Sequence, residues 1–202
     1  MVSVMINTQF EMPIYNIERT LSKSTFKREP MPKNPSPIVI SAYQSNWPEL
    51  FNQESAVIQS LIGNYITVIE HIGSTAVAGL AAKPIIDILI GVNHLSDSPR
   101  FVPPLQELGY IYVPEHEVDL PERRYLYKQE SGEDTFHLHM VEPQSDFFRR
   151  HLAFRDYLRT HPEAVAEYAA LKIRLAGEFG SDRSGYTDAK TDFIKEIEEK
   201  AK

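Results

Sequence analysis

The sequence predicts an α+β fold in which a mixed β-sheet with covering helices is followed by a C-terminal helical block. Apolar runs rich in β-branched residues alternate with segments of helical periodicity as far as Val141. From about residue 145 onward, only the helical pattern recurs. The chain has 202 residues, of which 42% are hydrophobic, and this is enough to build one substantial core.

Residues 1–37 differ in composition from the rest of the chain. Prolines at positions 13, 30, 32, 35 and 37 are mixed with basic residues, and few apolar residues recur at any period. We therefore predict an extended or disordered arm for this segment. We expect the folded domain to span residues 38–202, with its C-terminal helices starting near residue 145.

The folded domain is predicted to begin with a short strand at residues 38–40. A helix follows, because Asn46 can cap its first turn, Pro48 suits a first-turn position and Gly63 provides a stop. The apolar positions of this helix repeat with the helical period: Leu50, Phe51, Val57, Ile58, Leu61 and Ile62.

Two strands are predicted next, at residues 65–72 and 85–92. Gly73 and Ser74 break the chain after the first strand, and residues 75–80 form a short helical turn. The second strand is almost continuously apolar, which is typical of a strand buried on both faces. Asp87 is the one ionisable residue within that run.

The remaining elements follow from turn residues and periodicity. We expect a helix from Asp97 or Ser98 to residue 108, an edge strand at 110–113, a charged loop at 114–122, hairpin strands at 125–129 and 135–141, and helices at 146–159, 162–179 and 188–201. The turn of the hairpin is predicted within residues 130–134, which contain a glycine between acidic residues.

Composition excludes several classes of protein. The formal net charge of −7 argues against a general nucleic-acid binder, which needs a basic face. The absence of cysteine excludes disulfides, thiolate catalysis and thiolate zinc sites. No apolar run approaches the roughly 20 residues of a membrane span, and the first residues lack the pattern of a signal peptide. We therefore expect a cytoplasmic protein that does not enter a membrane.

The segment from Gly73 to Asp87 carries the strongest chemical signal. A glycine lets backbone amides approach a phosphate closely, and Ser74 adds a hydroxyl donor. An ordinary turn with Ser74 as its cap is the alternative. Asp87 is costly to bury unless it is paired or bound to a metal, and Mg²⁺ favours oxygen ligands. The alternative for Asp87 is an ion pair with Lys83 or an arginine.

The chain resembles the GrpB family of the nucleotidyltransferase superfamily. The matching stretches are EHIGSTAVAGL (70–80), KPIIDI (83–88), FHLHM (136–140), FRDYLR (154–159), YAALK (168–172) and YTDAK (186–190). The resemblance implies a nucleotidyltransferase-like sheet. It also implies metal-assisted transfer of a nucleotidyl group from a nucleoside triphosphate to a small acceptor, with Mg²⁺ or another divalent metal on Asp87. Some family members are fused to dephospho-CoA kinase, which points to nucleotide or coenzyme metabolism.

One position departs from the superfamily pattern. Active members carry a second acid two residues after the first, whereas this chain has Leu89. The later strand carries His137 and His139, which alternation places on one face. These histidines could complete a metal site with Asp87, one could act as general base, or both could be structural. Glu142 could supply a missing carboxylate.

Basic residues near the predicted cleft are candidates for phosphate contacts. Arg124, Lys190 and Lys83 are favoured, although ordinary surface charge is the alternative for each. Lys190 follows Tyr186 by one helical turn, a spacing that suits a tyrosine stacked on a base and a lysine on phosphate. Two alternatives to nucleotidyl transfer stay open: an inactive nucleotide- or phosphometabolite-binding module, and a metal-dependent hydrolase that uses Asp87, His137 and His139.

Overall fold

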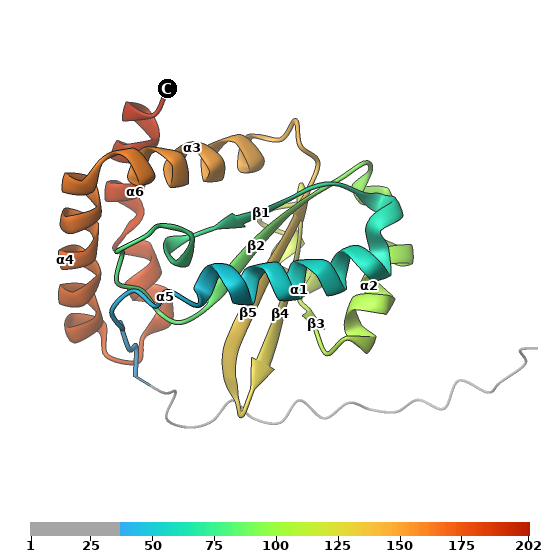
Figure 1. Cartoon of the computed structure of the whole chain (residues 1–202), viewed down its shortest axis with the longest axis horizontal. Helices are drawn as coiled ribbons and strands as arrows, with labels where there is room; N and C mark the ends of the chain where they lie inside the picture. The colour runs from blue at the N-terminus through green and yellow to red at the C-terminus, as the bar shows by residue number, and fades with distance from the viewer. Residues whose placement is uncertain (1–36) are drawn as a thin grey trace, which may run out of the picture. The chain divides into compact units, whose positions relative to one another are not determined.

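The structure, a computed structural model, describes residues 37–202, so the predicted arm lies outside the described residues except for Pro37. The described chain builds a five-stranded sheet with the order β1-β2-β5-β4-β3 (Figure 1). The strands are β1 (Ile66–Ile72), β2 (Ile86–Val92), β3 (Ile111–Tyr112), β4 (Arg123–Glu130) and β5 (Glu133–Val141). β2 and β5 are parallel and the other neighbours are antiparallel, which confirms the predicted mixed sheet.

The helices divide into two groups. They are α1 (Trp47–Ile62), α2 (Ser98–Glu107), α3 (Asp146–Thr160), α4 (Pro162–Phe179), α5 (Arg183–Asp188) and α6 (Thr191–Lys200). In Figure 1, α1 runs across the front of the sheet and α2 lies beside it, whereas α3 to α6 gather to one side. The predicted C-terminal helical block is therefore confirmed. None of the helices in the described residues is long and apolar enough to cross a membrane.

The largest core cluster lies between α1, α2 and one face of the sheet. Alternate residues of β2, Ile86, Ile88 and Ile90, point to this face and are fully or almost fully buried. They pack with Trp47 from α1 and Phe101 from α2, among others. Burial of such side chains contributes roughly 1.5–3 kcal/mol each, so this face anchors the central strands.

The opposite face of the sheet carries the polar residues of the predicted site. Asp87 and Leu89 share this face of β2, and Asp87 is the cross-strand partner of His137 on β5. Leu89 is fully buried and packs with Ile72, Val141 and Phe147. The position where the superfamily pattern has a second acid is therefore part of an apolar contact with α3.

The beginning of the described chain differs from the prediction. Residues 38–40 do not form a strand; the nearest ladder contact is an isolated bridge between Ser41 and Ala82. The Ile38 amide donates to Gly180 O at 2.8 Å, because this segment runs past the end of α4. β-branched residues favour extended backbone, but a strand also needs a partner along its whole length.

Helix α1 also corrects two details. Asn46 precedes α1, but its side chain makes no capping hydrogen bond. Of the apolar positions predicted as the buried face, Ile58 and Ile62 are buried, whereas Val57 and Leu61 are exposed. The helix is rotated so that only one of its two apolar rows meets the sheet.

The C-terminal end holds one more correction. The predicted helix at 188–201 corresponds to α6, which begins at Thr191. The short helix α5 precedes it and was not predicted; it starts where Asp182 accepts a hydrogen bond from the Gly185 amide. In the hairpin, Ser131 and Gly132 both have positive φ, as a two-residue turn requires, so β4 and β5 extend further than predicted. At its other end, β4 begins at Arg123 and not at the predicted residue 125, so Arg123 and Arg124 lie within it.

Candidate functional site

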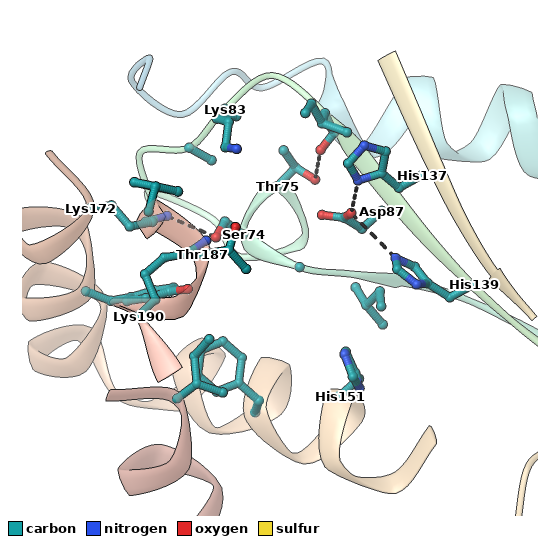
Figure 2. Close-up of a pocket in the computed structure, with 18 of the residues that line it drawn as sticks. Ser74, Thr75, Lys83, Asp87, His137, His139, His151, Lys172, Thr187 and Lys190 are labelled. Carbon is teal, nitrogen blue, oxygen red and sulfur yellow. Dashed lines mark hydrogen bonds and ion pairs between the residues drawn. The ribbon is translucent and has the colours of Figure 1, made fainter. Parts of the chain in front are cut away.

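A cavity of about 520 Å³ lies between the polar face of the sheet and the C-terminal helices. Gly73, Ser74 and Asp87 all line it, together with residues of α3 to α6 (Figure 2). The Asp87 side chain keeps 26% of its surface exposed. The predicted turn and the predicted carboxylate therefore open into one common cavity.

Gly73 connects β1 to the short 3-10 helix Ser74–Ala76 in a conformation reserved for glycine. Its φ is 69° and its ψ is −170°, a region that other residues rarely enter. A Cβ atom at this position would lie 2.2 Å from Asp87 Oδ2. The glycine thus serves two purposes, because it permits the turn and leaves room for the carboxylate.

Asp87 is held by two histidines of β5. Its Oδ1 lies 3.2 Å from His137 Nδ1 and 3.8 Å from His139 Nε2. Figure 2 shows the other carboxylate oxygen directed away from the histidines, toward the Ser74–Thr75 turn. Burial opposes ionisation of Asp87, but the hydrogen bonds from the two histidines and the charge of His137 outweigh it and hold the pKa of Asp87 well below the usual range.

His137 bridges two carboxylates. Its second ring nitrogen, Nε2, lies 3.3 Å from Asp134 Oδ2. Burial lowers the pKa of His137, but Asp134 and Asp87 outweigh burial and raise it to about 9. At neutral pH the ring is therefore an imidazolium with both N–H groups engaged. It can donate a proton but cannot accept one, which disfavours the general-base interpretation for this histidine.

His139 differs from His137 because its second neighbour is a cation. Arg123 Nη1 lies 3.4 Å from His139 Nδ1, and a guanidinium can only donate. His139 Nδ1 is therefore the acceptor, and its Nε2–H faces Asp87. Burial is the main cause that lowers the pKa of His139, so this ring is neutral.

Three lysines line the opposite part of the cavity, and each rests on an aromatic ring. Lys83 and Lys190 lie 4.9 and 4.3 Å from the centroid of Tyr186, and Lys172 lies 4.6 Å from the centroid of Tyr168. Lys172 Nζ also donates to Ser74 Oγ at 2.9 Å. Figure 2 shows Lys172 and Lys190 to the left of Ser74, Lys83 above it, and the histidines to the right. We call Lys83, Lys172 and Lys190 the lysine group.

The lysine group is electrostatically unfavourable in the free protein. Burial, followed by repulsion from Lys190, lowers the pKa of Lys172 to about 7. Burial, followed by repulsion from Lys83, lowers the pKa of Lys190 to about 8. An anion placed among these ammonium groups would relieve the repulsion and raise both pKa values.

The distribution of ion pairs over the protein singles out this cavity. Among the lysines and arginines of residues 37–202, those without an ion pair in this part of the chain are Lys83, Arg123, Lys172, Lys190 and Lys195. Four of these five line the cavity, and the other, Lys195, is an exposed residue of α6. The two carboxylates that line the cavity are already engaged, Asp87 with His137 and Glu198 with Arg150.

Two predicted contacts need correction. Arg124 points to the other face of β4, where it pairs with Glu117 at 3.1 Å and does not line the cavity. Tyr186 is buried beneath Lys190, so its ring is not free to stack on a base. The remaining candidates, Gly73, Ser74, Lys83, Asp87, His137, His139 and Lys190, all line the cavity. Glu142 lies elsewhere, accepting from the Leu95 amide.

Arg123, Lys172 and His151 line the cavity although the sequence did not favour them as site residues. Arg123 could have been found from the hairpin register, because Tyr125 is the cross-strand partner of His139 and Arg123 shares its face. Lys172 and His151 come from helices whose docking has no local signal in the sequence.

The residues fit poorly to the two-metal site that the superfamily implies. Among residues 37–202, Asp87 is the one carboxylate that faces the Ser74 turn, and Leu89 occupies the second acid position within the apolar core. His137 would have to lose its proton and one of its aspartate partners to bind a metal. Across residues 37–202, no group of three or more histidine, aspartate or glutamate side chains is arranged to hold a metal ion.

A comparison with known protein families identifies the chain. The profile described as GrpB protein matches residues 37–200. The chain belongs to the GrpB family. Among its relatives, the glutamate-rich protein GrpB of Alkalihalophilus pseudofirmus is 37% identical over 166 residues, which are 81% of this chain and 95% of that protein. The crystal structure of the conserved protein GrpB from Enterococcus faecalis has a TM-score of 0.73 and 35% identity, covering 81% of this chain and 96% of that chain.

A more distant relative has a named activity. Dephospho-CoA kinase of Mycolicibacterium paratuberculosis is 24% identical over 189 residues, which are 82% of this chain and 46% of that protein. The GrpB family has the nucleotidyltransferase-like fold, so the predicted fold class is confirmed. Family membership does not assign a reaction to the GrpB cavity.

Proposed function

We propose that this GrpB protein binds a nucleotide or a related phosphorylated metabolite, with the phosphates on the lysine group and Ser74. The observation that carries the proposal is that, among the lysines and arginines of residues 37–202, four of the five without an ion pair in this part of the chain line one cavity. Lys172 is buried and Lys83 and Lys190 are partly buried without a carboxylate partner in the described residues. Holding these charges out of water costs free energy, which a multivalent anion would recover on binding. The volume of the cavity suits a small molecule.

The named activity of a relative agrees with this class of ligand. Dephospho-CoA is itself a phosphorylated adenosine derivative, and the relative's name states that the enzyme acts on it. Adenosine phosphates and dephospho-CoA are therefore the first ligands to examine.

Nucleotidyl transfer to a small acceptor is a second candidate function. It is favoured by the Asp87 carboxylate oxygen that faces the Ser74–Thr75 turn, since this is where phosphates would approach. The transfer would need a divalent metal, partly held by Asp87, to neutralise charge on the phosphates when bound. The substitution of the second acid by Leu89 speaks for a binding module without turnover. A metal-dependent hydrolase would instead need His137 and His139 as ligands.

Ligand binding is measured by calorimetric titration of ATP, ADP, pyrophosphate and dephospho-CoA, each with Mg²⁺ and with EDTA. We expect at least one ligand to bind, and Lys172→Met and Lys190→Met to weaken it at least tenfold. Lys195→Met is the matched control, because Lys195 is exposed and outside the cavity. Equal binding by all four proteins, or none by any ligand, would contradict the proposal.

Turnover and metal content separate the candidates. Pyrophosphate release from a nucleoside triphosphate in the presence of an acceptor, lost in Asp87→Asn, would establish nucleotidyl transfer. Stoichiometric zinc or iron in the purified protein, lost in His137→Gln, would favour the hydrolase instead. Binding with neither result would establish the binding module.

A further inference from the structure

Arg123 lines the cavity next to His139, which Figure 2 shows across Ser74 from Lys172 and Lys190; we call this the far end of the cavity. This arginine belongs to β4, and its guanidinium lies over the rings of Tyr125 and Phe147, at 5.1 and 5.5 Å from their centroids. Two aromatic rings therefore fix the position of the charge without neutralising it.

The hydrogen bonds of Arg123 are few and weak. Nη1 contacts His139 Nδ1 at 3.4 Å and Nη2 contacts His116 Nδ1 at 3.5 Å, both at the long limit for hydrogen bonds. Its Nε is buried and has no hydrogen-bond partner. Because a guanidinium has five N–H donors, most of the bonding capacity of Arg123 is unused in the free protein.

Arg123 supplies the permanent positive charge at this end of the cavity. His139 and His151 line the same part of the cavity, and burial lowers their pKa values, that of His151 to about 4, so both rings are neutral. Asp87 is compensated by the His137 imidazolium. Arg123 thus contributes a single positive charge here, whereas the lysine group contributes several at the other end.

We propose that Arg123 forms a separate subsite for a carboxylate, so that the natural ligand or pair of ligands carries phosphate at one end and a carboxylate at the other. This inference rests on the proposed phosphate site at the lysine group. A carboxylate matches the fork of a guanidinium in shape and in charge. In a transfer reaction, the carboxylate would belong to the acceptor; in a binding module, it would belong to the same metabolite.

Two series of small molecules test the subsite. The first consists of phosphonocarboxylates with one to four methylenes between the two acidic groups, and the second consists of alkylphosphonates of the same lengths. Calorimetric or NMR titration gives the affinity of each compound. We expect at least one phosphonocarboxylate to bind at least tenfold more tightly than its alkylphosphonate counterpart.

Substitutions at Arg123 and its neighbour Arg124 show whether the higher affinity for phosphonocarboxylates depends on Arg123. Arg123→Gln should abolish the advantage of the carboxylate while leaving alkylphosphonate affinity within twofold, and Arg123→Lys should retain part of it. Arg124→Gln is the matched control, because Arg124 pairs with Glu117 on the other face of the strand. Thermal unfolding of each variant shows that the fold is retained.

The outcomes separate a failure of the carboxylate subsite at Arg123 from a failure of the phosphate site at the lysine group. If both series bind with equal affinity at every length, or if Arg123→Gln weakens both series alike, the carboxylate subsite is wrong and the phosphate site stands. If neither series binds, the phosphate site fails and the subsite fails with it.

Discussion

The Asp87 carboxylate occupies the space in which a side chain at position 73 would lie, with Oδ2 2.2 Å from the Cβ that Gly73 lacks. This relationship joins the turn after β1 to the neighbouring strand and keeps the carboxylate at the edge of the cavity. Because His137 and His139 hold the other oxygen, the carboxylate cannot swing away without losing those contacts.

Gly73→Ala is expected to destabilise the protein more than Gly79→Ala. Both glycines have positive φ, and such strain costs of order 1–3 kcal/mol, but nothing lies within 4 Å of a Cβ at Gly79. Urea denaturation gives the free energy of unfolding of each variant, and the difference between Gly73→Ala and Gly79→Ala therefore measures the cost of the clash with Asp87. In an Asp87→Ala background the difference should shrink, since the clashing oxygen is gone. Equal costs for the two glycines would show that the clash is unimportant.

Asp87→Asn is expected to lower the pKa of His137 from its value of about 9. The substitution removes one of the two negative charges that favour the imidazolium. The pKa can be followed through the ring-proton chemical shift of His137 in NMR spectra recorded from pH 5 to pH 10. His94, which is exposed, serves as the reference resonance. An unchanged midpoint for His137 would mean that Asp134 alone sets its protonation.

The raised pKa of His137 also makes its contribution to stability depend on pH. The folded pKa of about 9 lies above the ordinary histidine pKa of 6.5, so the contribution is complete below pH 6.5 and is lost as pH rises through 9. The difference in unfolding free energy between the wild type and His137→Gln should therefore decrease from pH 6.5 to pH 9. Both proteins carry the same lysines, so the contribution of lysine titration to the unfolding free energy cancels in this difference. A difference that stays constant or grows over this range would contradict the assignment.

Lys172→Met is expected to stabilise the free protein while it weakens anion binding. Lys172 is only 2% exposed and has no ion pair within the described residues, so its charge is buried at a cost. Replacing it by an apolar side chain of similar length should raise the free energy of unfolding at pH 6 by on the order of 1 kcal/mol, in buffer without multivalent anions. Lys195→Met should change stability by less than about 0.5 kcal/mol. A clear loss of stability in Lys172→Met would show that the bonds to Ser74 and Ala81 outweigh the burial of charge.

Sulfate binding should weaken as pH rises from 7 to 9. The charge of sulfate is constant over this range, whereas Lys172 and Lys190, with pKa values of about 7 and 8, lose protons. Because the anion favours the protonated lysines, we expect the dissociation constant to rise by at least about tenfold. Calorimetric titration at each pH measures the change, and proton uptake on binding at pH 8 is the independent check. A dissociation constant that does not depend on pH would exclude the lysine group as the binding site.

Local patterns in the sequence predicted the sheet side of the site. Gly73, Ser74 and Asp87 belong to one short stretch of the chain. His137 and His139 follow the alternation of a strand, so the sequence alone indicated that their side chains share one face of the sheet. Arg124 was favoured, but the strand predicted to begin at residue 125 begins at Arg123, and it is Arg123 that lines the cavity. A shift of one residue exchanges the two faces of a strand.

The helical side of the site depends on packing that no local pattern contains. Lys172 meets Ser74 across 98 positions of sequence, and the contact exists because α4 docks beside the 3-10 turn. Tyr186 was expected to stack on a base, yet it is buried beneath Lys190. It belongs to the short helix α5, which the sequence did not predict because Gly180 and Gly185 favour a turn. Such long-range contacts decide which cations face the cavity.

The most direct measurement is a crystal structure of the protein soaked with selenate, a phosphate mimic whose selenium is located by anomalous scattering. We expect an anomalous peak in the cavity, within contact distance of Ser74 Oγ and the ammonium groups of Lys172 and Lys190. A cavity without selenium, in crystals that bind it only at exposed sites such as Lys195, would contradict the assignment of the lysine group to phosphate.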